Sequence, residues 1–141
     1  MKHTKWAVLV MLVTLSGLAV AQMIGSTRIV TEVPFEFVAG NRIVPAGECA
    51  VQAGTLDRQT LQLNNVAAKV GLFLRTSTTE SKAGAGHYAL VFHRYGDQYF
   101  LTGVKLQGSK ISYRVQESKA EAELRARNAS ATDETLLAYT K

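Results

Sequence analysis

Two apolar, aromatic runs lie on either side of the pair Gly96-Asp97, in the segment Leu90–Leu101. Glycine in the first position of a two-residue loop suits a type II′ turn, whose twist matches the twist of the strands that it joins. The pattern therefore predicts a hairpin in which Tyr95 lies opposite Gln98. One face would carry Tyr88, Leu90, Phe92, Tyr99 and Leu101, and the other Ala89, Val91, Phe100, Val104 and Leu106. Because both faces are largely apolar, we expect these strands to be central, with something packed on each side.

In the rest of the chain before residue 118, apolar and polar residues alternate in short segments, and turn residues separate these segments. Pro34 lacks an N–H group and suits an edge position or a bend. Asn64-Asn65 fits a tight hairpin loop, because asparagine tolerates the left-handed conformation. The polar stretch 76–86 is expected to be a mobile surface loop. The predicted strands are Thr27–Val38, Arg42–Val44, Glu48–Gln52, Gln59–Leu63, Val66–Arg75 and Ile111–Val115.

The spacing of apolar residues changes after Ser118, from the alternation typical of strands to the spacing typical of a helix. Glu121 follows this serine by three residues, which is a capping-box pattern, and good helix formers continue to Arg127. We expect the helix to dock through Ala120 and Leu124, with i,i+4 ion pairs such as Glu121–Arg125 on its surface. The last residues, 129–141, are weakly patterned and predict a weakly structured C-terminal tail.

About seven short strands followed by one helix predict a mostly β fold, either an antiparallel sandwich or a small barrel with a short C-terminal helix. Residues 22–128 would form this single domain. They provide enough chain for one domain with a real core and too little for two.

The first 21 residues have the pattern of a secretory signal peptide. Lys2 and Lys5 precede an apolar run, and Ala19-Val20-Ala21 supplies the small residues that signal peptidase accepts, so cleavage is expected before Gln22. A membrane anchor is the rival interpretation, but the apolar run is short for a spanning helix. We therefore expect an exported protein, periplasmic or extracellular, with no membrane span after cleavage.

Charge and cysteine content narrow the functional classes. The full chain has 16 basic and 11 acidic side chains, and the bases are spread singly with no run of the kind that nucleic-acid binding usually shows. Cys49 is the only cysteine, so no disulfide can form within the chain. Its place in an alternating segment favours burial as a small apolar residue.

Candidate chemistry is sparse. His87 and His93 would lie about 20 Å apart on one strand and could not share a metal ion. His93 is expected to be a hydrogen-bonded, half-buried residue of the sheet. Nothing around Cys49 resembles an activated thiol, and no glycine-rich phosphate loop precedes a helix, so neither a catalytic residue nor a cofactor or metal site is predicted.

The hairpin tip is the one candidate binding patch. Arg94, Tyr95, Asp97 and Tyr99 could together form a small recognition surface, with the Arg94 guanidinium over the Tyr99 ring and Asp97 as a counter-charge. The competing interpretation, which we favour, is that these side chains only stabilise the turn and shield the end of the hairpin.

Two segments resemble a family of small exported proteins of soil bacteria. They are Val33-Pro34-Phe35-Glu36-Phe37-Val38-Ala39-Gly40-Asn41, which runs on to Pro45-Ala46-Gly47-Glu48, and the hairpin segment from Leu90 to Leu101. Ser118-Lys119-Ala120-Glu121 is similar to the closing helix of that uncharacterised family. Cys49 departs from it, since an aromatic residue is expected there. The resemblance implies export and a compact, β-rich domain, and transfers no functional residue.

These observations favour a non-catalytic exported β domain that binds or assembles with a cell-envelope or extracellular partner. An edge strand near Pro34 could pair with an envelope protein or with a second copy of the chain. The alternatives are a small barrel that carries an apolar ligand and, last, a hydrolase that uses Cys49 or a serine.

Overall fold

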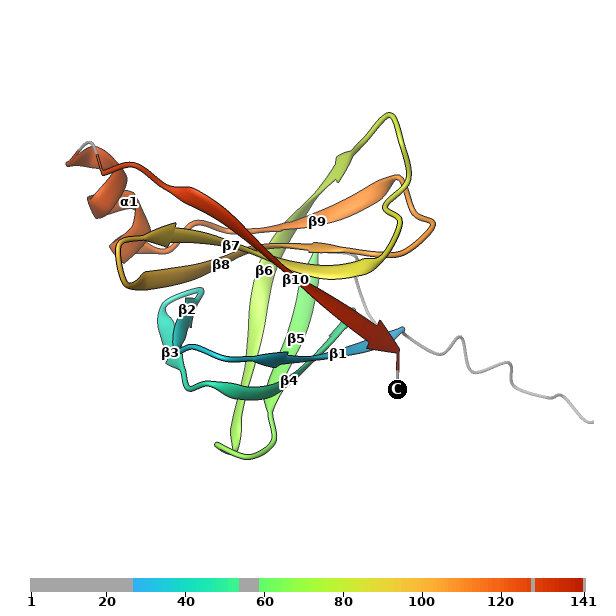
Figure 1. The fold of residues 1–141 in the computed structure, drawn as a ribbon, viewed down its shortest axis with the longest axis horizontal. Coiled ribbons are helices and arrows are strands. Elements are labelled where there is room, and N and C mark those ends of the chain that lie inside the picture. The colour runs from blue at the N-terminus through green and yellow to red at the C-terminus, as the bar shows by residue number, and fades with distance from the viewer. Residues whose placement is uncertain (1–26, 54–58, 128, 141) are drawn as a thin grey trace, which may run out of the picture.

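The computed structural model describes residues 27–53, 59–127 and 129–140, and in them the chain forms ten strands and one helix. Eight of the strands close into an antiparallel barrel in the order β1-β4-β5-β6-β9-β8-β7-β10, with β10 returning to β1 (Figure 1). Of the two architectures predicted, the small barrel is therefore the correct one. The strands of the barrel are β1 (Arg28–Val33), β4 (Gly47–Ala53), β5 (Thr60–Asn65), β6 (Val70–Glu80), β7 (Tyr88–Tyr95), β8 (Gln98–Lys105), β9 (Ile111–Val115) and β10 (Thr132–Thr140).

A small hairpin and the helix are added to the barrel. Strands β2 (Phe37–Ala39) and β3 (Arg42–Val44) pair with each other, and β2 joins β8 in parallel through Val38 and Phe100. Pro34 lies in the break between β1 and β2, as expected of a residue that cannot donate to a ladder. The helix α1 (Lys119–Ala126) follows β9.

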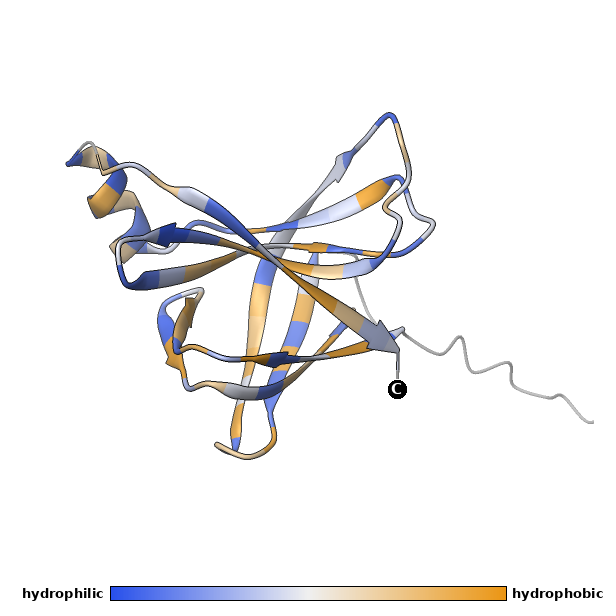
Figure 2. Cartoon of the chain, viewed as in Figure 1, coloured by the Kyte–Doolittle hydropathy of each residue, from blue (hydrophilic) through white to orange (hydrophobic). Residues whose placement is uncertain are grey.

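The core fills the inside of the barrel. Apolar residues alternate with polar ones along strands such as β5, which Figure 2 shows as successive orange and blue bands. Phe37 and Phe92 meet edge to face in the centre, with ring centroids 5.2 Å apart. Burial of each such side chain contributes about 1.5–3 kcal/mol. The buried cluster comprises Ile29, Val33, Phe37, Ala39, Val44, Cys49, Val51, Leu61, Leu63, Leu72, Leu74, Leu90, Phe92, Leu101, Val104, Tyr113 and Val115.

The predicted central hairpin is confirmed as β7 and β8, with Tyr95 opposite Gln98 and Phe92 opposite Leu101. Gly96 has φ of +62° and Asp97 has a negative φ, as a type II′ turn requires. The predicted faces are wrong beyond Leu101. A bulge shifts the register there, so Val104 lies opposite Leu90 and joins the core face.

The predicted turn at Asn64-Asn65 is wrong. Both residues belong to β5, and the chain turns over the next four residues, where Lys69 has φ of +53°. Asn65 is buried, and hydrogen bonds satisfy its side-chain amide there: Nδ2 donates to the Pro45 carbonyl at 2.9 Å, and Oδ1 accepts from the Ala68 N–H at 3.1 Å. It anchors the turn from inside the strand.

Two polar segments that were predicted to be irregular are strands. Residues 76–80, placed in a mobile loop, extend β6 and pair with β9 along their whole length. The segment 129–141, expected to be a weakly structured tail, contains β10, which pairs with β7 through seven residues and meets β1 through two. In both cases long-range pairing supplies the hydrogen bonds that the local sequence does not suggest.

The helix begins as predicted, since the Ser118 hydroxyl accepts a hydrogen bond from the Glu121 N–H at 3.1 Å. Its docking differs from the prediction. Ala120 is exposed and Leu124 half-buried, whereas Glu121 is the buried residue. Arg125 pairs with Glu117 at 2.9 Å in place of Glu121. The predicted signal peptide, residues 1–21, lies outside the described residues.

Candidate functional site

The four residues of the predicted tip patch do not form one surface. Neighbouring residues of a strand point to opposite faces. Tyr95 accordingly lies on the outer face, where its hydroxyl donates to Glu121 at 3.3 Å, while Arg94 and Tyr99 lie together on the other side. The Arg94 guanidinium is 5.6 Å from the centre of the Tyr99 ring, as predicted. Its ion-pair partner is Glu134 at 3.6 Å, and Asp97 is exposed at the turn.

Two of these side chains, Tyr99 and Arg94, make further contacts within the chain. Tyr99 stacks on Phe35, with ring centroids 3.7 Å apart and planes 12° from parallel. The Arg94 Nε donates to the Gly96 carbonyl at 2.7 Å. These contacts hold the β2–β3 side of the barrel against the hairpin and fix the turn, which is the stabilising role that we favoured for the tip.

A groove lies away from the hairpin tip, on the outward-facing residues of β6, β9, β8 and β7. It has a volume of about 960 Å³ and reaches the helix and β10. Gly103 forms part of its floor, and a Cβ atom there would come within 3.2 Å of the Tyr113 carbonyl. The outward side chains that line the groove are Arg75, Ser77, Thr79, Val91, His93, Thr102, Lys105, Ser112, Arg114, Gln116, Glu117, Glu121, Arg125 and Asp133.

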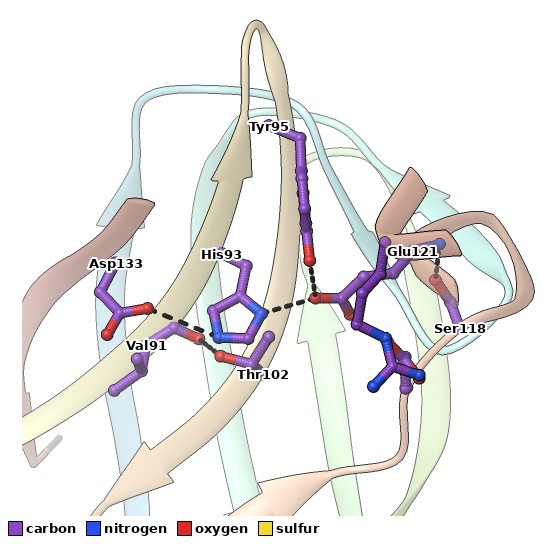
Figure 3. A network of polar contacts seen from close by, with 9 residues as sticks. Val91, His93, Tyr95, Thr102, Ser118, Glu121 and Asp133 are labelled. Atoms are coloured by element: carbon purple, nitrogen blue, oxygen red, sulfur yellow. Dashed lines mark hydrogen bonds and ion pairs between the residues drawn. The ribbon is translucent and has the colours of Figure 1, made fainter. Parts of the chain in front are cut away.

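At the helix end of the groove a polar network joins three elements (Figure 3). His93, on β7, lies between two carboxylates: its Nδ1 is 2.6 Å from Glu121 of the helix, and its Nε2 is 3.4 Å from Asp133 of β10. Burial, together with the adjacent Glu121 carboxylate, raises the pKa of Tyr95 above its usual value. The prediction that His93 is a hydrogen-bonded residue of the sheet is confirmed.

The two ring nitrogens of His93 differ in their partners: Nδ1 is hydrogen-bonded to the buried Glu121 carboxylate, and Nε2 lies 3.4 Å from the exposed Asp133 carboxylate. The network therefore has the geometry of a clamp that holds the helix and β10 against β7.

Three cations lie across the groove. Arg75 of β6, Arg114 of β9 and Lys105 of β8 are exposed and line it, and none of them has an ion-pair partner within the described ranges. Arg75 lies toward the helix, since its carbonyl accepts from the Gln116 N–H at 2.9 Å, whereas Lys105 lies farther away, opposite Ser112. Arg125, which also lines the groove, is paired with Glu117. The groove therefore offers three cations to a molecule from solution.

Cys49 lies in the core, away from the groove, and its thiol is free and fully buried. Burial and the nearby Glu32 and Glu48 carboxylates raise its pKa to about 11. A nucleophilic cysteine needs the opposite shift, because the thiolate is the reactive form.

Within residues 27–53, 59–127 and 129–140, no group of three or more His, Cys, Asp or Glu side chains is placed to hold a metal ion. None of the helices described is long and apolar enough to cross a membrane. Comparison with known proteins gives no match, whether to a family model, a curated protein or a solved structure.

Sequence reasoning did not find the groove. The signal available was the alternation of Ser112 and Arg114 with apolar Tyr113 and Val115, which indicates a polar outer face. That alternation does not predict that β6 pairs with β9. This pairing brings Arg75 into the same surface as Ser112 and Arg114.

Proposed function

We propose that this protein is a non-catalytic binding domain, exported to the periplasm or beyond, that holds a partner of the cell envelope or extracellular space in its outer groove. The observation that carries the proposal is a hollow of about 960 Å³ with three exposed cations that lack partners among the described side chains. A cation in a concave site attracts and orients an oppositely charged ligand.

Two further observations support binding over catalysis. The thiol of Cys49 is buried with a raised pKa, and both nitrogens of His93 face carboxylates. Cys49 and His93 were the conceivable nucleophile and base of a cysteine hydrolase. The apolar-carrier alternative requires an enclosed apolar cavity. The core cluster occupies the inside of the described barrel, and the groove of about 960 Å³ is open and lined mainly by polar residues, so neither observation favours that alternative.

Photo-crosslinking in producing cells tests the proposal. A benzoylphenylalanine at Ser77 would lie in the groove, whereas one at Phe73 would lie on the same face of β6 but outside the groove, where a native aromatic side chain is already 73% exposed. We expect position 77 to form an adduct in every preparation and position 73 to form none. Recovery of unmodified protein alone from position 77, or of the same adducts from both positions, would overturn the proposal.

Self-association through the edge near Pro34 remains a second mode of assembly. β1 pairs with β4 through six residues but with β10 through only two, and beyond that pairing Glu32 is exposed whereas Val33 is fully buried, so the open part of this edge is at Glu32. Such an edge can accept a strand from another molecule. In the same cells, a benzoylphenylalanine at Glu32 would report this mode as a crosslinked dimer.

A further inference from the structure

The three cations of the groove lie on a straight diagonal across neighbouring strands. Ser77 of β6 pairs with Arg114 of β9, and Arg114 pairs in turn with Gly103 of β8. Arg75 lies two residues before Ser77 on β6, and Lys105 lies two residues after Gly103 on β8. These two residues are displaced from that row in opposite directions. With strands ~4.8 Å apart and two residues spanning ~6.6 Å, each neighbouring pair of cations has its Cα atoms ~8 Å apart.

A linear arrangement of this kind fits an extended ligand with repeated negative charges. Arginine presents a planar fork that binds a carboxylate through two parallel hydrogen bonds, and lysine adds a point charge. Since neighbouring cations repel one another, a polyanion that lies along the diagonal also relieves that repulsion.

The floor of the groove determines which polyanion fits. β9 is paired on both sides, with β6 and with β8, so a peptide could not add to it as a further strand. The ligand must therefore be recognised by side chains. Beside the three cations these include the hydroxyls of Thr60, Ser77, Thr79, Thr102 and Ser112. A hydroxyl can donate and accept a hydrogen bond, and the Thr102 hydroxyl already donates to the Val91 carbonyl at 3.2 Å. The carboxylates of the same groove, Glu117, Glu121 and Asp133, lie beside Arg125 and His93 at its helix end.

Aromatic side chains are scarce on this surface. Tyr113 lines the groove but is only 9% exposed and belongs to the core cluster. Proteins that bind single-stranded nucleic acid stack the bases on exposed aromatic rings, and this groove provides no such platform among its described lining residues.

From this combination of cations, hydroxyls and fully paired strands, we propose that the groove binds an extended acidic polysaccharide, a sugar chain that carries carboxylates. Arg75, Arg114 and Lys105 bind successive carboxylates, and the hydroxyl side chains bind the sugar hydroxyls. This inference rests on the proposed function, because it names the ligand class for the same groove.

Binding of polygalacturonate by the protein purified from producing cells tests the inference. The groove variant is Arg75→Glu with Arg114→Glu. The matched control, Arg42→Glu with Lys119→Glu, changes the net charge equally at exposed sites outside the groove. Since the groove variant loses two charge-assisted contacts, we expect it to bind at least about tenfold more weakly, with the control within about twofold of the wild type. Arg75→Gln with Arg114→Gln, which adds no negative charge, should bind with intermediate affinity.

Two comparison polymers and the crosslinking experiment separate the outcomes. Neutral dextran should not bind, and raising the salt concentration should weaken polygalacturonate binding. Equal losses in the groove and control variants would overturn the inference, because binding would then follow net charge alone. Poly-glutamate binding that depends on the groove, without polygalacturonate binding, would overturn the sugar class and leave the proposed function standing. If no polymer binds but the Ser77 adduct still forms in cells, the sugar class is overturned and the proposed function stands. If the Ser77 adduct does not form, the proposed function itself is overturned.

Discussion

Removing the Glu121 carboxylate should weaken the attachment of the helix to the barrel. Glu121 is only 3% exposed and accepts from the Tyr95 hydroxyl at 3.3 Å, while its carboxylate lies 2.6 Å from His93. A hydrogen bond to a charged group contributes about 1.5–3 kcal/mol, and a buried hydroxyl left without a partner costs about 1–3 kcal/mol. His93 is half exposed and can turn to water, so most of the loss comes from Tyr95. We expect Glu121→Ala to lower the free energy of unfolding by about 2–4 kcal/mol.

Urea denaturation measures this loss, and Glu123→Ala is the matched control. Glu123 is an exposed glutamate of the same helix, so its replacement removes the same charge and changes helix propensity equally. The midpoint should fall in Glu121→Ala with little change in the slope m. In a Tyr95→Phe background the cost of Glu121→Ala should be smaller by more than half, about 1–3 kcal/mol, since the hydroxyl that loses its partner is already absent. If the two glutamate variants unfold within about 0.5 kcal/mol of each other, the buried carboxylate does not hold the helix.

Two further predictions concern titratable groups in the barrel. Because the pKa of Cys49 is raised to about 11, we expect Ellman's reagent at pH 8 to leave the native thiol unmodified and to label it within minutes in denaturant; rapid labelling of native protein would contradict this burial. Tyr95 has a raised pKa in the folded state, so the folded protein holds this proton more tightly than the unfolded chain does. Stability should therefore fall as the pH rises from about 10 toward the folded-state pKa. Urea midpoints between pH 9 and 11 should fall less steeply in Tyr95→Phe, and equal slopes would contradict the assigned shift.

The sequence by itself determined the features that depend on neighbouring residues. Gly96 specifies the type II′ turn because only glycine adopts its positive φ without cost, and Ser118 begins the helix because its hydroxyl reaches the N–H three residues on. Pro34 separates β1 from β2 because it has no N–H to donate. The alternation of apolar residues also predicted a mostly β fold with one short helix.

Only the tertiary structure decided which strands meet. The polar residues 76–80 became strand through pairing with β9, and Thr132–Thr140 closed the barrel through pairing with β7 and β1. Glu121 had a local pattern that indicated a cap, yet its carboxylate is buried because His93 and Tyr95 from β7 lie beside it. The candidate groove depends on the same long-range register, since Arg75, Arg114 and Lys105 come from three strands. Local propensity extends over a few residues, whereas strand pairing is settled by the burial of a whole core, and this is why the site could not be predicted from the sequence.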